Sequence, residues 1–357
     1  MTTTAKIIKT YEPWEKILSM GITSPKELSI IPDQDSAGIQ KVAESYPMFI
    51  NPYYLKLLKT KGDPIYGQAV PDIREITKLD GLDDPLNEEG LSPVPGLTHK
   101  YPDRALFLIS SRCAMYCRFC NRKRKVGHPS MVTKESIKEG IAYIKATKTI
   151  RDVLLSGGDP LLLQDNELAH ILEKIHSIPH VEIIRIGTRV PCTLPQRVTP
   201  KLTKMLKRFH PLYINTHFNH PSEITSEAAS ACALLADAGI PIGCQTVLLN
   251  GINDNPSVIR RLMQKLLTIR VKPYYLFQAD LAKGTSHFWT PLEKGLEIMS
   301  ELQGYTTGLC IPRFIIDLPH GGGKIPVTPS YIKDTAGEKL IIKNYQGKEY
   351  IYPIKPH

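Results

Sequence analysis

The feature that most constrains this chain is a run of three cysteines. Cys113, Cys117 and Cys120 lie within eight residues, at the spacing C-x3-C-x2-C. Thiolates are the usual protein ligands of iron–sulfur clusters, and a [4Fe-4S] cluster normally takes four of them. Three close thiols without an evident fourth therefore predict a [4Fe-4S] cluster with one iron open to a small molecule. Zinc is the alternative, but it would need a fourth nearby ligand, and His128 is the only near candidate.

The other cysteines and the hydropathy pattern bear on where the protein works. The chain has 357 residues and seven cysteines, an odd number in a chain too long for a small disulfide scaffold. We therefore expect reduced thiols and a cytoplasmic location. The N-terminus carries no apolar signal segment, and no run of about 18 apolar residues occurs, so we expect no membrane span.

The chain is basic, with 45 Lys and Arg against 35 Asp and Glu, a formal charge of +10. Residues 122–125 form a basic run beside the thiols. An iron–sulfur protein that binds nucleic acid is one interpretation. We favour attraction for anionic cofactors and substrates, because the other basic residues are spread along the chain. We therefore expect no nucleic-acid partner.

Short apolar runs alternate with helical segments from Ala105 onward. Strands are predicted at 105–110, 152–157, 181–187, 212–217, 242–248, 273–278 and 313–317. Helices are predicted at 133–147, 165–177, 200–209, 223–238, 254–268 and 291–303. This alternation indicates an α/β protein with a parallel sheet and crossover helices. Six or seven such units are typical of a barrel or partial barrel.

The pattern divides the chain into three parts. Residues 1–100 are predicted to form a helical N-terminal region, with a long irregular connection over 62–95 that is rich in Gly, Pro, Asp and Asn. We recognise no chemistry there and expect packing against the barrel or a second subunit. Residues 101–329 are the catalytic barrel. Residues 330–357 form a tail with a short hairpin around residues 336–337.

Polar residues gather at the predicted strand ends, where a β/α barrel carries its active site. The residues are Ser110, Gly157, Gly158, Asp159, Gly187, His217, Gln245, Asp280 and Asp317. The glycines at 157 and 158 would let the backbone approach a ligand closely, and Asp159 could receive an ammonium group.

A second glycine-rich segment, residues 321–323, precedes Lys324 after the last predicted strand. It is not a phosphate-binding P-loop, because Ile325 follows the lysine where Ser or Thr is needed. We expect a lysine on a flexible loop, able to form a Schiff base with a carbonyl cofactor.

At this point the chain resembles the lysine 2,3-aminomutase family of radical S-adenosylmethionine (SAM) enzymes, over residues 94–329. The matching segments are 113–120, 156–160, 194–200, 215–221, 234–239, 273–275 and 321–324. The resemblance implies a radical SAM partial (β/α)6-type barrel with a [4Fe-4S] cluster, SAM on its open iron, and pyridoxal 5′-phosphate (PLP). It also implies an isomerase that converts L-lysine to β-lysine by 1,2-amino migration.

The resemblance also implies roles for particular residues. Lys324 resembles the lysine that forms the Schiff base with PLP, and Arg104 a ligand of its phosphate, helped by Lys100 and Tyr101. Arg122 resembles the arginine that pairs with the substrate carboxylate, a task that suits a permanently charged fork. The SAM contacts implied are Gly157, Gly158, Asp159, His217 and Gln245. Asp280 and Asp317 resemble the pair that binds the distant ammonium group of the substrate.

One departure concerns zinc, which well-known members bind partly through C-terminal cysteines. This chain has no cysteine after Cys310, and Asn255 stands where an upstream ligand would be expected, so we expect no zinc. The remaining cysteines are then expected to be small buried residues: Cys192, Cys232, Cys244 and Cys310.

Several expectations on function and partners stay open between alternatives. A lysine aminomutase that serves the modification of elongation factor P is a close alternative, and so is a 2,3-aminomutase for another amino acid. The stereochemistry of the β-lysine product also stays open. We expect a one-electron reductant such as flavodoxin or ferredoxin, and a homo-oligomer.

Overall fold

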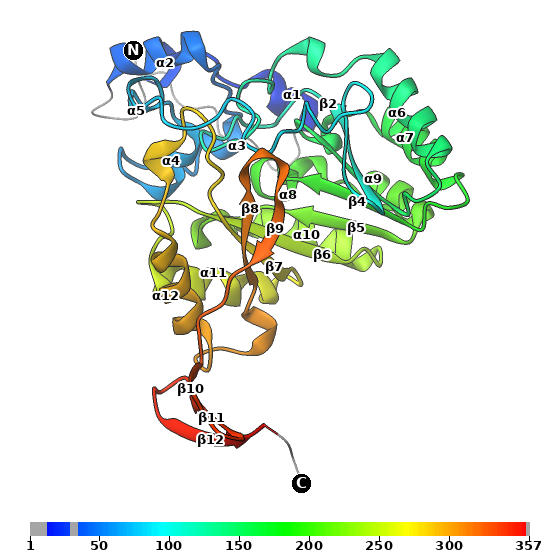
Figure 1. Cartoon of the computed structure of the whole chain (residues 1–357). Helices are drawn as coiled ribbons and strands as arrows, with labels where there is room; N and C mark the ends of the chain where they lie inside the picture. The colour runs from blue at the N-terminus through cyan, green and yellow to red at the C-terminus, as the bar shows by residue number, and fades with distance from the viewer. Residues whose placement is uncertain (1–12, 29–34, 355–357) are drawn as a thin grey trace.

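The computed structural model describes residues 13–28 and 35–354, and a nine-stranded sheet forms its centre (Figure 1). The strands follow one another in sheet order as in sequence: β1 (Leu97–Tyr101), β2 (Arg104–Ser110), β3 (Asp152–Gly157), β4 (Ile183–Thr188), β5 (Leu212–Thr216), β6 (Ile242–Leu248), β7 (Lys272–Gln278), β8 (Arg313–Leu318) and β9 (Gly323–Pro326). Strands β2 to β8 are parallel. The predicted parallel α/β arrangement is therefore confirmed.

Helices link the parallel strands as crossovers, which confirms the partial (β/α)6-type barrel. They are α6 (Lys134–Ala146), α7 (Asp165–His176), α8 (Val190–Thr193), α9 (Pro200–Leu206), α10 (Ser226–Asp237), α11 (Pro256–Thr268) and α12 (Leu292–Leu302). Their amphipathic character explains the packing, since α11 buries Ile259, Leu262, Met263 and Leu266, which recur at helical spacing.

The two edge strands were not predicted from the sequence. Strand β1 pairs antiparallel with β2, and β9 pairs antiparallel with β8. Both are short, at five and four residues, so they give little periodicity to detect. Lys324 lies on β9, directly opposite Asp317 of β8. The expectation of a lysine on a flexible loop is therefore wrong, because pairing with β8 fixes its backbone.

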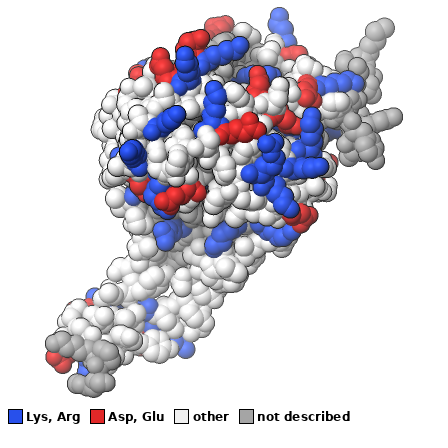
Figure 2. Space-filling model, turned by 90° about the vertical axis from the view of Figure 1, so that its right-hand side faces the viewer, with Lys and Arg blue, Asp and Glu red and all other residues white. Residues whose placement is uncertain are grey.

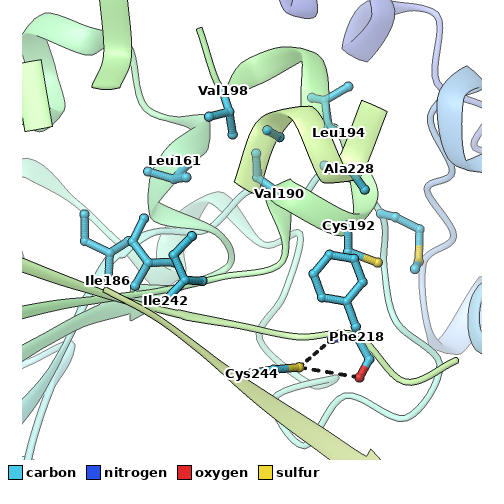
Figure 3. Packing of buried hydrophobic residues seen from close by; sticks show 14 of the residues in the cluster. Leu161, Ile186, Val190, Cys192, Leu194, Val198, Phe218, Ala228, Ile242 and Cys244 are labelled. Carbon is cyan, nitrogen blue, oxygen red and sulfur yellow. Dashed lines mark hydrogen bonds between the residues drawn. The ribbon is translucent and has the colours of Figure 1, made fainter. Parts of the chain in front are cut away.

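One hydrophobic core extends from the N-terminal region through the barrel, from Trp14 to Phe314. Figure 3 shows part of this core, where Cys192 lies near Phe218 and Cys244 is hydrogen-bonded to the backbone of Phe218. The Phe218 amide donates to the Cys244 sulfur at 3.4 Å. The four cysteines outside the motif are buried and free, as expected.

The N-terminal region consists of short helices that pack beside the cysteine loop. They are α1 (Trp14–Ser19), α2 (Ser36–Ser45), α3 (Pro52–Leu55), α4 (Pro64–Ala69) and α5 (Arg74–Thr77). The Tyr116 amide donates to the Phe49 carbonyl at 2.9 Å, and the Arg118 amide donates to the Gln68 carbonyl at the same distance. The region therefore holds the backbone on which the motif thiols are carried.

A cluster of buried charged side chains also connects the N-terminal region to the cysteine loop. Glu75 is fully buried, and its carboxylate accepts hydrogen bonds from the Arg118 guanidinium at 2.5 and 3.0 Å and from the Lys123 ammonium at 2.7 Å. Burial alone would raise the pKa of Glu75, but the two cations outweigh it and lower that pKa. The carboxylate is therefore ionised at neutral pH and is the counterion of both cations.

The tail forms a separate three-stranded sheet of β10 (Ile332–Ala336), β11 (Lys339–Lys343) and β12 (Glu349–Pro353). The predicted hairpin around residues 336–337 is confirmed, and β12 extends it. Figure 1 shows this sheet projecting from the body, on the side away from helices α1 to α5, and Figure 2 shows the same projection from another side. Across the described ranges, no helix has the length and apolar character needed to cross a membrane.

We predict that Glu75→Gln lowers the free energy of unfolding by about 3–5 kcal/mol, because two buried cations lose their counterion. The stabilisation is present at neutral pH and is lost as the pH falls through the lowered pKa of Glu75. Anaerobic chemical denaturation of the holoprotein measures the change. Glu297→Gln is the matched control, because Glu297 pairs with Lys294 at 2.6 Å on the surface and should matter by less than about 1 kcal/mol. Equal losses for both variants would contradict the buried cluster's role.

Candidate functional site

The cysteine loop begins where β2 ends, and two glycines fix its first residues. The Gly158 amide donates to the Ser110 carbonyl, and the Asp159 amide donates to the Arg112 carbonyl, both at 2.6 Å. A Cβ at Gly157 would lie 2.1 Å from the Ser110 oxygen, and one at Gly158 would lie 2.3 Å from the Arg112 oxygen. Glycine is therefore required at both positions for the loop after β3 to pack against the cysteine loop.

The three motif thiols are free and influence one another electrostatically. Burial raises the pKa of Cys113 well above its usual value and that of Cys120 to about 11, and the neighbouring cysteines add to both shifts. Thiolates would therefore require a strong positive charge nearby, which cluster iron supplies. In the described part of the chain, no group of three or more His, Cys, Asp or Glu side chains is arranged to hold a single metal ion. A four-iron cluster binds each cysteine through a different iron. Its three cysteine ligands therefore need not meet at one point, as the ligands of a single metal ion must.

Arg189, which sequence reasoning missed, contacts the cysteine motif directly. It follows β4, and its Nη1 donates to the Cys117 sulfur at 2.8 Å. Its Nη2 donates to Gln68 at 2.6 Å and to the carboxylate of Glu223 at 2.7 Å. The sequence did offer a signal for Arg189, because it stands just after a strand, and the other candidate site residues were chosen for that position.

Asp159 is buried, and its carboxylate accepts hydrogen bonds from neighbouring protein groups. It accepts hydrogen bonds from the Thr188 hydroxyl at 2.7 Å and from the backbone amides of Leu161, Arg189 and Val190. Burial nevertheless raises its pKa to about 6. Asp159 thus ties the end of β3 to the end of β4, and its contact with a SAM ammonium group stays a prediction.

His217 and Gln245 belong to neighbouring strands, but only His217 stands at a strand end, because Gln245 lies in the middle of β6 and not near its end as expected from the sequence. His217 follows β5, and the backbone of Gln245 on β6 lies close enough to counteract in part the lowering of the imidazole pKa. Burial, with smaller contributions from the charges of Arg189 and Arg122, lowers the pKa of His217 to about 4. The imidazole is therefore neutral at pH 7, in a region whose positive charge suits an anionic ligand.

Side chains bridge the two edges of the barrel around Lys324. The Lys324 amide donates to the Tyr101 hydroxyl at 2.9 Å, so β9 is tied to the end of β1. Asp317 accepts hydrogen bonds from Lys100 at 3.0 Å and from the Lys324 ammonium. The Arg104 guanidinium lies 3.9 Å from the centre of the Tyr101 ring. The structure thus brings together all four residues predicted to contact PLP.

The two predicted substrate carboxylates influence one another. Burial, with a smaller contribution from the charge of Asp317, raises the pKa of Asp280 to about 6. Asp280 accepts a hydrogen bond from the Asn121 side chain at 2.7 Å, while Asp317 is 8% exposed and already binds two lysines. A cation placed near Asp280 would therefore relieve an unfavourable interaction.

Arg122 is held by Glu88, a second residue that sequence reasoning missed. Its Nε donates to both carboxylate oxygens of Glu88, at 3.0 and 2.8 Å, and its Nη2 donates at 2.6 Å. Its Nη1 faces the Ser156 hydroxyl at 3.5 Å. Burial opposes the charge of Arg122, but Glu88 raises its pKa above the usual value. Glu88 lies in the irregular segment before β1, where no chemistry was expected.

The rest of the basic run is also neutralised by this N-terminal segment. Arg124 lies 3.2 Å from Asp84 and 3.1 Å from Glu89, and Lys125 lies 3.0 Å from Glu89. Figure 2 likewise shows Lys and Arg interspersed with Asp and Glu on the face in view. The run that suggested nucleic-acid binding is therefore explained by internal ion pairs.

Comparison with known proteins agrees with this geometry. The family model of the radical SAM superfamily matches residues 107–263, and the lysine-2,3-aminomutase model matches residues 299–356. The L-lysine 2,3-aminomutase of Methanococcus maripaludis is 53% identical over 90% of this chain and 76% of its own length. The chain belongs to the lysine 2,3-aminomutase family.

Other relatives show how the family varies. The L-lysine 2,3-aminomutase of Clostridium subterminale is 50% identical over 88% of this chain and 76% of its own length. The glutamate 2,3-aminomutase of Clostridioides difficile is 44% identical over 95% of this chain and 82% of its own length. As a radical SAM family, lysine 2,3-aminomutases imply a [4Fe-4S] cluster and SAM, and the cysteine motif at the end of β2 fits that cluster.

We predict that replacing Cys113, Cys117 or Cys120 by Ala abolishes the iron content and the visible absorption of the cluster, because three ligands are already the minimum. Anaerobic iron and sulfide analysis of the purified protein measures this. Cys192→Ala is the matched control, since Cys192 is buried in the core and should leave the iron content intact. Equal iron loss in both kinds of variant would count against the assignment.

Proposed function

We propose that the protein is a radical SAM, PLP-dependent isomerase that converts L-lysine to β-lysine by moving the amino group from C2 to C3. The observation that carries the proposal is the charge arrangement of the site. It offers the cation of Arg122 and the paired carboxylates of Asp280 and Asp317, near the amine of Lys324. A diamino acid matches this arrangement, with a carboxylate at one end and an ammonium group at the other.

Glutamate matches the arrangement poorly. Its side-chain carboxylate would meet Asp280 and Asp317, two anions that already repel one another. Like charges across an interface cost several kcal/mol, which disfavours glutamate as the substrate. The relative from C. difficile is named as a glutamate 2,3-aminomutase, so family membership alone does not decide the substrate. The acidic pair is the feature of this chain that supports lysine.

When bound, the cluster with SAM supplies a carbon radical that abstracts hydrogen, and PLP supplies the π-bonded nitrogen that permits the shift. This chain's residues hold and orient the reactants. Lys324 binds PLP through its amine, and Arg104, with Lys100 and Tyr101, holds the phosphate. Gly157, Gly158, Asp159, His217 and Gln245 form the SAM site. Arg122 binds the substrate carboxylate, and the acidic pair binds its ε-ammonium group.

Binding of PLP at Lys324 and of the substrate ammonium group at Asp317 would require one rearrangement in this chain. Lys324 and Lys100 both contact Asp317, so the ammonium of Lys324 lies where the substrate ammonium would bind. Holding PLP through its amine would turn Lys324 away from Asp317 and leave one side of that carboxylate for another cation. The occupied Asp317 therefore supports the assignment of this carboxylate to cation binding.

We also propose the setting in which the enzyme works. Within the predicted N-terminal region 1–100, the described residues act as a cap that holds the cysteine loop of the barrel at 101–329, and the described residues of 330–357 form a tail. A one-electron reductant such as flavodoxin or ferredoxin reduces the cluster in the cytoplasm. A homo-oligomer is supported by the exposed apolar side chains of the tail, among them Tyr350, Ile351 and Tyr352, which are 55%, 70% and 61% exposed.

We predict that Asp280→Asn lowers kcat/KM for L-lysine by roughly 30- to 4,000-fold at pH 8, because an unpaired buried charge costs about 2–5 kcal/mol. In the parent enzyme, kcat/KM should fall as the pH drops through about 6, where Asp280 becomes protonated, and this limb should vanish in the variant. Asp280 is the sharper choice because Asp317 also contacts Lys324. Anaerobic assays with SAM and reductant, read by mass spectrometry, measure the β-amino acid formed.

The same assay with glutamate, arginine and alanine controls for substrate choice. Lysine should be converted faster than each by orders of magnitude in the parent enzyme. Turnover of glutamate at the rate of lysine, or full lysine activity in Asp280→Asn, would overturn the proposed substrate.

We predict that borohydride reduction of the PLP-loaded enzyme fixes the cofactor to Lys324, because this amine contacts Asp317 and its backbone is tied to Tyr101 at the barrel edge. Peptide mapping by mass spectrometry identifies the modified lysine. Lys324→Arg should abolish the labelling, whereas Lys294→Arg, a surface change on α12, should leave it intact. Labelling at a different lysine in the parent enzyme would contradict the assignment.

A further inference from the structure

The carboxylate of Glu88 is directed at one edge of the Arg122 guanidinium. Glu88 is 6% exposed, and three hydrogen bonds of 2.6 to 3.0 Å join it to Nε and Nη2 of Arg122. Hydrogen bonds between charged groups are roughly twice as strong as neutral ones, and a two-pronged contact also fixes the plane of the guanidinium. Arg122 therefore has one defined orientation rather than a set of rotamers.

The segment that carries Glu88 is itself anchored on two sides. The His99 amide of β1 donates to the Leu91 carbonyl at 2.9 Å. The His320 amide, in the turn before β9, donates to the Pro85 carbonyl at 2.9 Å. The segment around Glu88 is thus fixed both to β1 and to the turn that leads to the predicted PLP lysine.

The contact with Glu88 leaves the opposite part of the guanidinium available. Arginine has five N–H donors in a planar fork. Glu88 engages the edge made by Nε and Nη2, while the end formed by Nη1 and the second hydrogen of Nη2 remains for another acceptor. Near this end, Nη1 has only a 3.5 Å contact to the Ser156 hydroxyl. A carboxylate can bind end-on there without displacing Glu88.

We propose that Glu88 is a positioning residue for the reaction: it aims the free end of Arg122 at the substrate carboxylate and so sets where the migrating amino group lies. This inference rests on the proposed function. Glu88 also balances the charge of Arg122 before substrate binds, so it contributes orientation rather than attraction for the substrate. Its removal should therefore affect the turnover rate more than the affinity.

The test compares Glu88→Gln with the parent holoenzyme, per unit of bound iron and PLP. Gln keeps the shape of Glu88 but loses the charged two-pronged contact. Because misplacement by about 1 Å can cost 10²-fold in rate, we expect kcat for L-lysine to fall about 10- to 100-fold. KM should change by less than about threefold, since the unbalanced Arg122 still attracts the substrate carboxylate. A purely structural role would lower the folded fraction and leave kcat per occupied site unchanged.

Glu89→Gln is the matched control on the same segment. Glu89 is exposed and pairs with Arg124 and Lys125, so kcat and KM should both stay at the parent values. A second comparison uses Arg122→Lys. If Glu88 acts through Arg122, adding Glu88→Gln to Arg122→Lys should lower kcat by less than about twofold further.

If the parent enzyme converts lysine, two outcomes would overturn this inference and leave the proposed function standing. One is a kcat of Glu88→Gln within twofold of the parent value. The other is an effect of Glu88→Gln on kcat that is as large in the Arg122→Lys background as in the parent enzyme. If the parent enzyme does not convert lysine, the proposed function falls and this inference with it. Should Glu88→Gln fail to accumulate as folded protein, Glu88→Asp carries the same expectation, because it keeps the charge and shortens the side chain by one methylene.

Discussion

The buried carboxylate of Glu75 is the interaction on which the site's geometry depends. Its two cations, Arg118 and Lys123, lie on either side of Cys120 in the sequence, and both are less than 10% exposed. Without Glu75 they would be buried charges without a counterion, which is costly. The cysteine loop can therefore adopt this path only while α5 is in place. The N-terminal region thus forms part of the catalytic structure.

Side chains from opposite edges of the sheet bring the second half of the site together. Strands β1 and β9 are its outermost strands, and the hydrogen bond from Lys324 to Tyr101 connects them, while the hydrogen bond from Lys100 to Asp317 connects β1 with β8. The predicted PLP lysine is therefore fixed by both edges of the barrel. Asp317 binds Lys100 and Lys324 in this structure, and the proposed substrate cation would bind to the same carboxylate.

Much of this architecture could be predicted from the sequence, because its signals are local. The parallel strands appear as separate apolar runs, and the three thiols lie within one loop. Gly157 and Gly158 were expected to let the backbone approach a ligand, and the structure shows that they are also needed for close contact with the Ser110 and Arg112 carbonyl oxygens. Lys324 was singled out from the sequence as a candidate reactive amine, a role that stays a prediction, whereas its strand was not predicted.

The missed residues are those whose partners lie far away in sequence. Glu88 lies in a segment without periodicity, and only the fold brings it to Arg122. Arg189 reaches Cys117 across 72 residues of sequence. Sequence patterns carry no information on such pairings, because nothing local distinguishes a carboxylate that will be buried from one that stays in solvent.

An anaerobic crystal structure of the holoenzyme with PLP, SAM and L-lysine would test the central claim most directly. The account predicts the lysine carboxylate end-on against Arg122, with Glu88 still bound to the other edge of the guanidinium. It also predicts the ε-ammonium group between Asp280 and Asp317, with Lys324 moved away from Asp317. A lysine bound in the reverse direction, or a Lys324 that still contacts Asp317 beside bound substrate, would contradict it.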